Sequence, residues 1–159
     1  MEARWDEIDL EKGIWVIPWQ RMKMGRKAVN PDRTDHRIDL PRQAVALLRW
    51  LHGTPGKEEY VFASPRSSGW PIRTAALNKV LASTGFKGCM TIHGFRALAA
   101  SCLDEMGFSC EVIEKQLAHK FGSRTFSSYH RAEYNDERKR MLQVWAVLWF
   151  MMSQIRLIL

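Results

Sequence analysis

The sequence predicts an α+β fold that is mainly α-helical and carries a small three-stranded antiparallel sheet. Short runs rich in β-branched and aromatic residues lie within residues 4–18 and 36–40, as expected of strands. From residue 41 onward, apolar residues recur at spacings of three and four, which is typical of amphipathic helices. At 159 residues the chain is long enough to bury its own core, so we expect one domain spanning residues 1–159.

The predicted sheet begins with two strands inside residues 4–18, WDEID and IWVIP, joined by a turn at 11–13. Pro18 is expected to end the second strand, because proline cannot donate to a strand ladder. A polar loop at 19–35 then leads to a third strand at 36–40. The sheet therefore carries a long basic hairpin arm. Its cations are Arg21, Lys23, Arg26, Lys27 and Arg33.

Helices are expected over 41–53, 74–83, 91–106 and 109–118, and from Asn135 to the C-terminus. Thr91 and Ser109 are the expected N-caps of the third and fourth helices. Between the first two helices, 60–64 is a candidate extended segment and 64–71 is expected to be irregular. The predicted inward positions include Val45, Leu48, Leu51, Leu77, Val80, Leu81, Phe95, Leu98, Cys102, Leu103, Met106, Val112, Ile113 and Leu117.

The charge balance favours a polyanionic partner such as nucleic acid, since 24 basic residues stand against 17 acidic ones. Three cysteines without a framework spacing argue against a secreted disulfide fold, and no CxxC pair supports zinc. The N-terminus lacks an apolar signal segment, and the apolar run at 144–152 is too short to span a bilayer. We therefore expect a cytoplasmic protein that needs no metal or other cofactor.

The candidate chemical centre lies within residues 91–134. His93 and Arg96 project from one face at the start of a predicted helix, His119 ends the next helix, and Tyr129 follows on a polar segment. Cutting DNA without water or metal needs a tyrosine to attack phosphorus and an arginine to stabilise the charge that develops on the phosphate oxygens. Histidines can hold the phosphate or move the tyrosine proton, and a lysine on a mobile arm can protonate the departing 5′-oxygen. Each residue alone also fits a structural role, but their order and spacing together favour this chemistry.

Three motifs, HGFR at 93–96, LAHK at 117–120 and YHRAEY at 129–134, closely resemble those of the tyrosine recombinases, specifically the catalytic domain of phage-type integrases. The resemblance covers about residues 4–145, and the segment WDEIDLEKGIWVIPWQRMKMGR is similar to the family's β-hairpin, whose loop carries a catalytic lysine. It implies the fold of the DNA breaking-rejoining enzymes. It also implies site-specific recombination of phage or prophage DNA through a 3′-phosphotyrosine intermediate, on double-stranded DNA and as a tetramer.

The resemblance assigns a role to each candidate. Tyr129 is the nucleophile, Arg96 clamps the scissile phosphate, His93 and His119 flank that phosphate, and Lys23 protonates the leaving 5′-hydroxyl. Two alternatives remain: Tyr134, which lies farther from His119 than the family's usual interval, and Lys27 in place of Lys23. Further DNA contacts are expected from Arg21, Arg26, Lys27, Lys120, Arg124 and Arg131.

The chain also departs from the family pattern. The family's first catalytic arginine lies in a helix before the segment WDEID, but only four residues precede Trp5, so we expect that helix and the N-terminal core-binding domain to be absent. A DNA-binding remnant without catalysis is therefore the alternative function. The C-terminal run at 147–159 is unusually apolar, and its stripe is expected to be buried, either within the chain or across a dimer contact. The stripe comprises Trp145, Leu148, Trp149, Met152 and Ile155.

Two further classes are disfavoured. A type IB topoisomerase is mechanistically close, but the spacing of the motifs favours recombination. A structural metal site built from His93, His119, His130 and the cysteines would need a ligand spacing that the sequence does not show.

Overall fold

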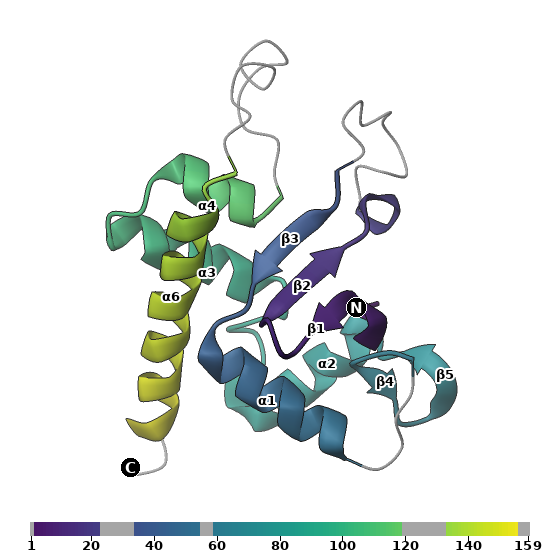
Figure 1. The fold of residues 1–159 in the computed structure, drawn as a ribbon. Coiled ribbons are helices and arrows are strands. Elements are labelled where there is room, and N and C mark those ends of the chain that lie inside the picture. Colours follow the sequence, from purple (N-terminus) through teal and green to yellow (C-terminus); the bar gives the residue numbers. More distant parts are fainter. Residues whose placement is uncertain (1, 23–33, 55–58, 119–132, 156–159) are drawn as a thin grey trace.

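The computed structural model describes residues 2–22, 34–54, 59–118 and 133–155, and the statements below concern these ranges. Helix α6 (Asn135–Ile155) runs along one side of the molecule (Figure 1). It packs against α1 (Arg42–Gly53), α3 (Gly94–Glu105), α4 (Cys110–Gln116) and strand β3 (His36–Asp39). The predicted mainly helical α+β fold is confirmed.

The predicted three-stranded antiparallel sheet is also confirmed. Strands β1 (Ile8–Asp9), β2 (Ile14–Ile17) and β3 are arranged in the order β1-β2-β3. The turn before β2 uses Gly13 at φ +66°, a conformation that glycine adopts without strain. The backbone N–H of Leu40 donates to the carbonyl of Gly13 at 2.7 Å, which joins this turn to the start of α1.

The expectation of a strand over WDEID was wrong for its first half. Trp5–Glu7 forms a 3₁₀ turn, and only Ile8 and Asp9 belong to β1. The physical reason is a local bond: the Glu7 carboxylate accepts the backbone N–H of Arg4 at 3.2 Å, which closes a tight turn and competes with strand pairing. The residues just before this turn still pair across the chain, since Arg4 forms an antiparallel bridge with Tyr60.

The predicted helices are found, and the predicted Ser109 cap forms. Helix α3 begins at Gly94 rather than just after Thr91, so its N-cap is His93, although the Thr91 hydroxyl still bonds to its first residue. The Thr91 hydroxyl accepts the N–H of Gly94 at 3.0 Å, and the Ser109 side chain accepts the N–H of Val112. Helix α2 (Thr74–Leu81) ends two residues earlier than expected and runs into a π-type turn, Ala82–Phe86. Helix α4 ends at Gln116 rather than at residue 118.

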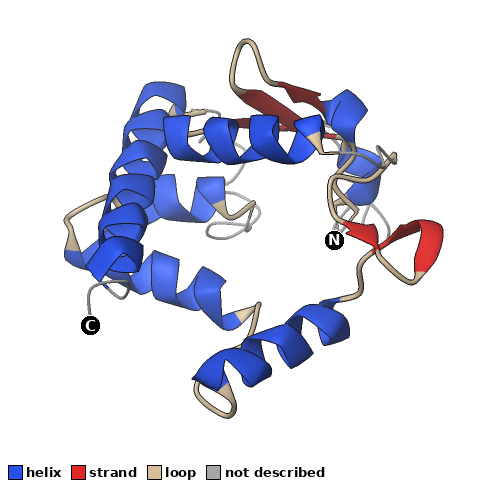
Figure 2. Ribbon diagram, turned by 90° about the horizontal axis from the view of Figure 1, so that it is seen from below, coloured by secondary structure: helices blue, strands red, loops and turns tan. Residues whose placement is uncertain are grey.

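Three other expectations need correction. The segment predicted to be irregular contains strand β5 (Ser67–Pro71), which pairs with β4 (Ala63–Ser64) in a small two-stranded sheet. Val80 was predicted to face inward but is 59% exposed, because α2 packs mainly against the turn that follows it and not against the helices of the main core (Figure 2). Met106 is also exposed, since it follows the last residue of α3.

The main core lies between α3, α4 and α6. Leu103, Val112, Ile113 and Met141 are buried there, and Met141 and Val112 have no accessible surface. Trp145 packs against this cluster one turn farther along α6. The core thus anchors the two helices that flank residues 119–132.

The C-terminal half of α6 is different. Trp149 makes an edge contact with Phe95, with ring centroids 5.3 Å apart, but it remains 42% exposed. Met151 and Met152 are 59% and 49% exposed. The expected burial of this stripe is therefore achieved only in part within the chain. No helix in the described ranges combines the length and apolar character needed to cross a bilayer.

Candidate functional site

The start of α3 sets the positions of His93 and Arg96. The Thr91 hydroxyl accepts the N–H of Gly94, and the N–H of Arg96 donates to the carbonyl of His93 at 3.1 Å. Gly94 is needed here because a Cβ at this position would lie 2.9 Å from the Met90 sulfur. The turn leaves His93 exposed at the helix N-terminus, where the unpaired N–H groups and the helix dipole favour an anion.

Arg96 joins α3 to the end of α4. Its Nη2 donates a hydrogen bond to the backbone carbonyl of Leu117. The side chain is half-buried, and Leu117 lies two residues before the predicted His119. The tertiary structure therefore places the His93–Arg96 pair beside the point where the segment carrying His119 and Tyr129 begins.

Gln116, the residue before Leu117, is bonded to residues of two other elements, β3 and α6. The Nε2 of His36, at the start of β3, lies 3.1 Å from the carbonyl oxygen of Gln116. Because a carbonyl only accepts, Nε2 carries the proton in the neutral ring. The side-chain oxygen of Gln116 accepts a bond from the Nε of Arg138 at 2.9 Å. Strand β3, α4 and α6 thus meet at one residue.

These contacts bring together parts of the chain that flank residues 23–33 and 119–132. Those two ranges hold the remaining predicted catalytic residues and lie outside the described residues. Strand β3 follows the segment that contains Lys23, and α4 and α6 flank the segment that contains His119 and Tyr129. Figure 1 shows the start of β3, the end of α4 and the start of α6 at the same end of the molecule. Of the predicted catalytic residues, the structure describes His93 and Arg96. The other predicted site residues lie outside the described ranges: Lys23, Arg26, Lys27, His119, Lys120, Arg124, Tyr129 and Arg131.

Arg21, a predicted DNA contact, is engaged within the chain. Its Nη2 lies 2.7 Å from Glu7 Oε2, and its Nη1 donates to the carbonyl of Glu2. Glu7 is 7% exposed and also accepts the indole N–H of Trp15 at 3.3 Å. In this structure Arg21 secures the start of the hairpin arm, and its contact with DNA stays a prediction.

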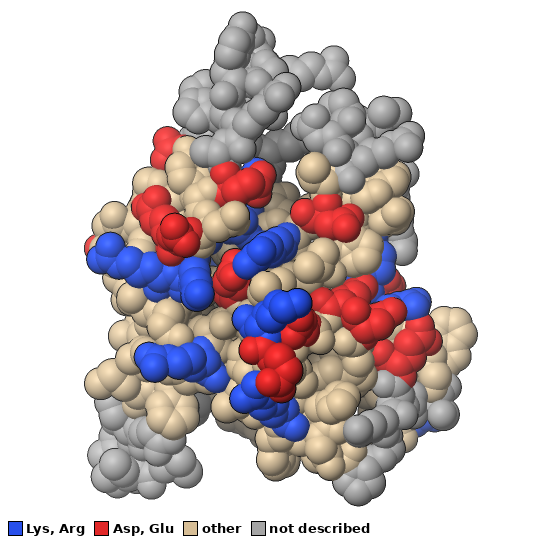
Figure 3. Space-filling model, in the orientation of Figure 1, with Lys and Arg blue, Asp and Glu red and all other residues tan. Residues whose placement is uncertain are grey.

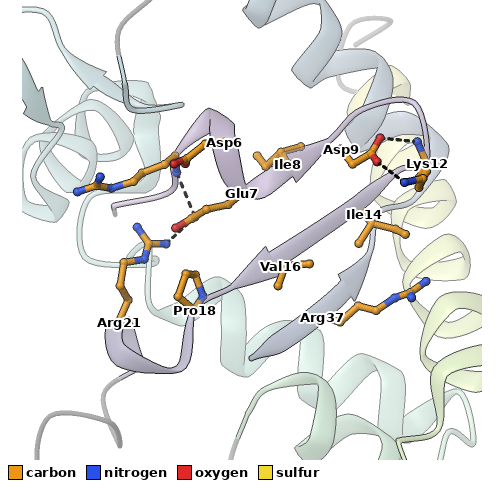
Figure 4. Close-up of a pocket in the computed structure, with 11 residues that line it drawn as sticks. Asp6, Glu7, Ile8, Asp9, Lys12, Ile14, Val16, Pro18, Arg21 and Arg37 are labelled. Atoms are coloured by element: carbon orange, nitrogen blue, oxygen red, sulfur yellow. Dashed lines mark hydrogen bonds and ion pairs between the residues drawn. The ribbon is translucent and has the colours of Figure 1, made fainter. Parts of the chain in front are cut away.

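An open concavity of about 810 Å³ lies over β1, β2 and β3 (Figure 4). Its cations are paired with carboxylates: Lys12 with Asp9 at 3.2 Å, and Arg37 with Asp39 at 2.9 Å. Figure 3 shows the same alternation of charge over the face of the molecule seen in Figure 1. Because paired cations attract a phosphate weakly, this concavity is a poor candidate for the DNA site. Within the described ranges, no group of three His, Cys, Asp or Glu is arranged to hold a metal ion.

The comparisons with known proteins agree with the geometry. A family model described as the phage integrase family matches residues 1–136. The chain belongs to the phage integrase family. The prophage integrase IntA of Escherichia coli (strain K12) is 37% identical over 147 residues, which cover 92% of this chain and 34% of that protein. The integrase of Enterobacteria phage P4 is 33% identical over 154 residues, which cover 91% of this chain and 35% of that protein.

The integrase of Shigella phage Sf6 is 33% identical over 144 residues, covering 90% of this chain and 35% of that protein. This integrase-family chain therefore spans about a third of the length of the curated relatives it matches. No solved structure matches it significantly. The predicted membership of the family is confirmed.

Sequence reasoning missed one residue of the site, Arg138. It is 3% exposed and connects β3, α4 and α6. A signal was present, since position 138 falls three residues before Met141 and seven before Trp145, on the apolar stripe of α6. A charged residue on such a stripe indicates a buried, hydrogen-bonded group.

Proposed function

We propose that this chain is the catalytic part of a site-specific recombinase that breaks and rejoins double-stranded DNA in the cytoplasm, during integration or excision of phage DNA. The observation that carries the proposal is the meeting of α3, β3 and α6 at residues Gln116 and Leu117. This meeting places the His93–Arg96 pair beside the ends of both segments that hold the remaining predicted catalytic residues. Membership of the phage integrase family supports the same chemistry.

In the proposed reaction, Tyr129 gives its phenol proton to a neighbouring histidine of the site. Its oxygen attacks the scissile phosphorus and forms a phosphotyrosine bond as the bond to the 5′-oxygen breaks. Lys23 gives its proton to that leaving oxygen. The DNA 5′-hydroxyl of a partner strand later attacks the phosphotyrosine and releases Tyr129, so the bond energy is conserved. No water or metal enters the cycle.

Arg96 has the right position to stabilise the charge that develops on the phosphate. Its side chain leaves the first turn of α3, close to the helix N-terminus and to exposed His93. A guanidinium offers donors in a planar fork that matches two phosphate oxygens. The bond to the Leu117 carbonyl holds this fork in place before DNA binds, so little reorganisation accompanies the reaction.

We further propose that residues 1–159 act as one catalytic domain and that the family's first catalytic arginine and its core-binding domain lie outside these residues. The chain's coverage of about a third of each relative supports this division. A clamp around DNA then needs the additional parts, while the nucleophile and Arg96 belong to this chain.

A nicked suicide duplex tests the proposed activity, because loss of the short cleaved fragment traps the covalent adduct. Wild-type protein is incubated with a library of such duplexes, and the adduct is detected by its shift in a denaturing gel. Tyr129→Phe should abolish the adduct, and the matched control Tyr134→Phe should retain it. An adduct that persists in Tyr129→Phe rejects Tyr129 as the nucleophile. Salt-sensitive DNA binding without any adduct favours the non-catalytic remnant instead.

We propose that the exposed half of α6 packs against a second copy of the chain. The exposed apolar side chains there include Val147, Trp149, Met151 and Met152. Exposed apolar area of this kind is costly in water unless another apolar surface covers it. Met151→Glu should shift the protein toward monomer in analytical ultracentrifugation, while Lys139→Glu on the first half of the helix should not. Identical mass distributions for wild type and Met151→Glu reject this contact.

A further inference from the structure

Arg138 is a buried cation at the start of α6. Only 3% of the residue is exposed. Its Nη2 donates to the carbonyl oxygen of Arg37 at 2.6 Å, and its Nε donates to the side-chain oxygen of Gln116 at 2.9 Å. Its Nη1 lies 3.4 Å from the carbonyl oxygen of Glu133. One side chain therefore contacts β3, the last residue of α4 and the residue that precedes Tyr134.

These partners are mostly uncharged. The nearest carboxylate, that of Glu133, lies 4.0 Å away and is 59% exposed, so its charge is screened by water. Burial is the main cause that lowers the pKa of Arg138. A buried charge with little ionic compensation is expensive and needs its hydrogen bonds. The bonds of Arg138 therefore determine how the three elements are arranged.

The three elements flank the predicted catalytic segments. Gln116 lies just before residues 119–132 and Glu133 lies just after them, and Arg138 bonds to both. An ion pair between Lys115 and Glu133, at 2.8 Å, spans the same gap nearer the surface. The backbone φ is +52° at Ala118 and +49° at Tyr134, a region that residues other than glycine rarely adopt and that surrounding contacts must hold.

We propose that Arg138 is a positioning residue for strand cleavage, because it holds together both ends of the 119–132 segment and ties them to β3. The inference rests on the proposed function, in which that segment carries Tyr129. Arg138 acts through the backbone and touches no DNA. An attacking oxygen must lie close to and in line with phosphorus, and a misplacement of about 1 Å costs roughly 10²-fold in rate.

The test compares Arg138→Met with Met141→Ala, a matched control that weakens the same core one turn away without touching the bonds of Arg138. Both are studied at a temperature where circular dichroism shows them folded. Arg138→Met should lower the single-turnover rate of adduct formation about 10²-fold, with an unchanged Kd for DNA. Met141→Ala should keep the wild-type rate. An equal loss of rate in both variants means that Arg138 only supports stability, and this overturns the proposal.

Arg138→Lys provides a second, milder variant, since it keeps the positive charge but cannot reach three acceptors in different directions. It should recover part of the rate lost in Arg138→Met. A rate for Arg138→Lys equal to that of wild type shows that the charge alone matters, and this contradicts positioning.

Amide hydrogen exchange separates this inference from the proposed function. The amides of Leu117 and Ala118 bond to the carbonyls of Ile113 and Lys115 at the end of α4. They should exchange faster in Arg138→Met, while the amides of α1 keep their wild-type rates. Unchanged exchange rates of the Leu117 and Ala118 amides in Arg138→Met overturn the anchoring role, whether or not the protein forms the adduct. When the additional parts that complete the DNA clamp are supplied, a wild-type protein that forms no adduct rejects the proposed function, and exchange still decides whether Arg138 holds the segment's ends.

Discussion

The guanidinium of Arg96 donates a hydrogen bond to the backbone carbonyl of Leu117, across 21 residues of sequence. This bond couples the His-x-x-Arg turn at the start of α3 to the end of α4. It holds a cation ready at the place from which the segment with His119 and Tyr129 departs. The proposed chemistry depends on this coupling.

Arg96→Lys should therefore impair catalysis much more than DNA binding. A lysine lacks the planar fork and cannot donate to Leu117 and to two phosphate oxygens together. We expect the rate of adduct formation on a suicide duplex to fall by about 10²–10³-fold. The Kd for DNA, measured by fluorescence anisotropy, should change far less. Arg66→Lys, at an exposed position near β5, is the control and should keep the wild-type rate.

Gly94→Ala should destabilise the protein by about 1–3 kcal/mol, because the new Cβ would lie 2.9 Å from the Met90 sulfur and 3.3 Å from the Thr91 hydroxyl that accepts the Gly94 N–H. Urea denaturation measures this change in the free energy of unfolding. The double variant Gly94→Ala with Met90→Ala should recover part of the loss. Gly53→Ala, where a Cβ meets nothing within 4 Å, should instead stabilise the protein by up to about 1 kcal/mol. Equal effects at both glycines would contradict the steric explanation.

Stability should depend on the titration of His36. Burial, and then the nearby positive charge of Arg138, lower the pKa of His36 below its ordinary value of 6.5. Lys115 adds to this effect, while the bond to the Gln116 carbonyl and the Glu133 carboxylate oppose it. Below pH 6.5 the unfolded chain binds the proton more readily than the folded chain, so the contribution is complete above that pH. It is lost as the pH falls through the pKa of the folded state.

The melting temperature of wild-type protein should consequently drop between pH 7.5 and pH 5. His36→Gln removes the titrating ring and retains an N–H donor for the Gln116 carbonyl. The drop should be smaller in this variant, as differential scanning fluorimetry would show. A pH dependence identical to wild type would mean that other groups cause it.

Met141→Ala should cost about 2–5 kcal/mol, since the side chain is fully buried among α3, α4 and α6 and its removal leaves a cavity. Leu47→Ala, at a 63% exposed position on α1, should change the free energy of unfolding by less than about 0.5 kcal/mol. Chemical denaturation of the two variants measures both values. A small effect at Met141 would place the core elsewhere.

The sequence by itself determined the elements whose signals are local. Ser109 caps α4 because its hydroxyl reaches an N–H three residues ahead. The periodicity of apolar residues located α1, α3, α4 and α6, and β-branched runs located β2 and β3. The motifs at 93–96, 117–120 and 129–134 together predicted the family, because each is a short local pattern.

The tertiary structure alone decided the features that join distant residues. Arg21 binds the carboxylate of Glu7, 14 residues away, and Arg4 forms an antiparallel bridge with Tyr60. The contacts of Arg138 with Arg37 and of His36 with Gln116 connect residues 101 and 80 positions apart. Their energies depend on burial and on the position of a partner, which packing sets and local spacing does not. For that reason the sequence could predict candidate reactive residues, whereas the junction at Gln116 and Leu117 depends on how the helices pack and was found only in the structure.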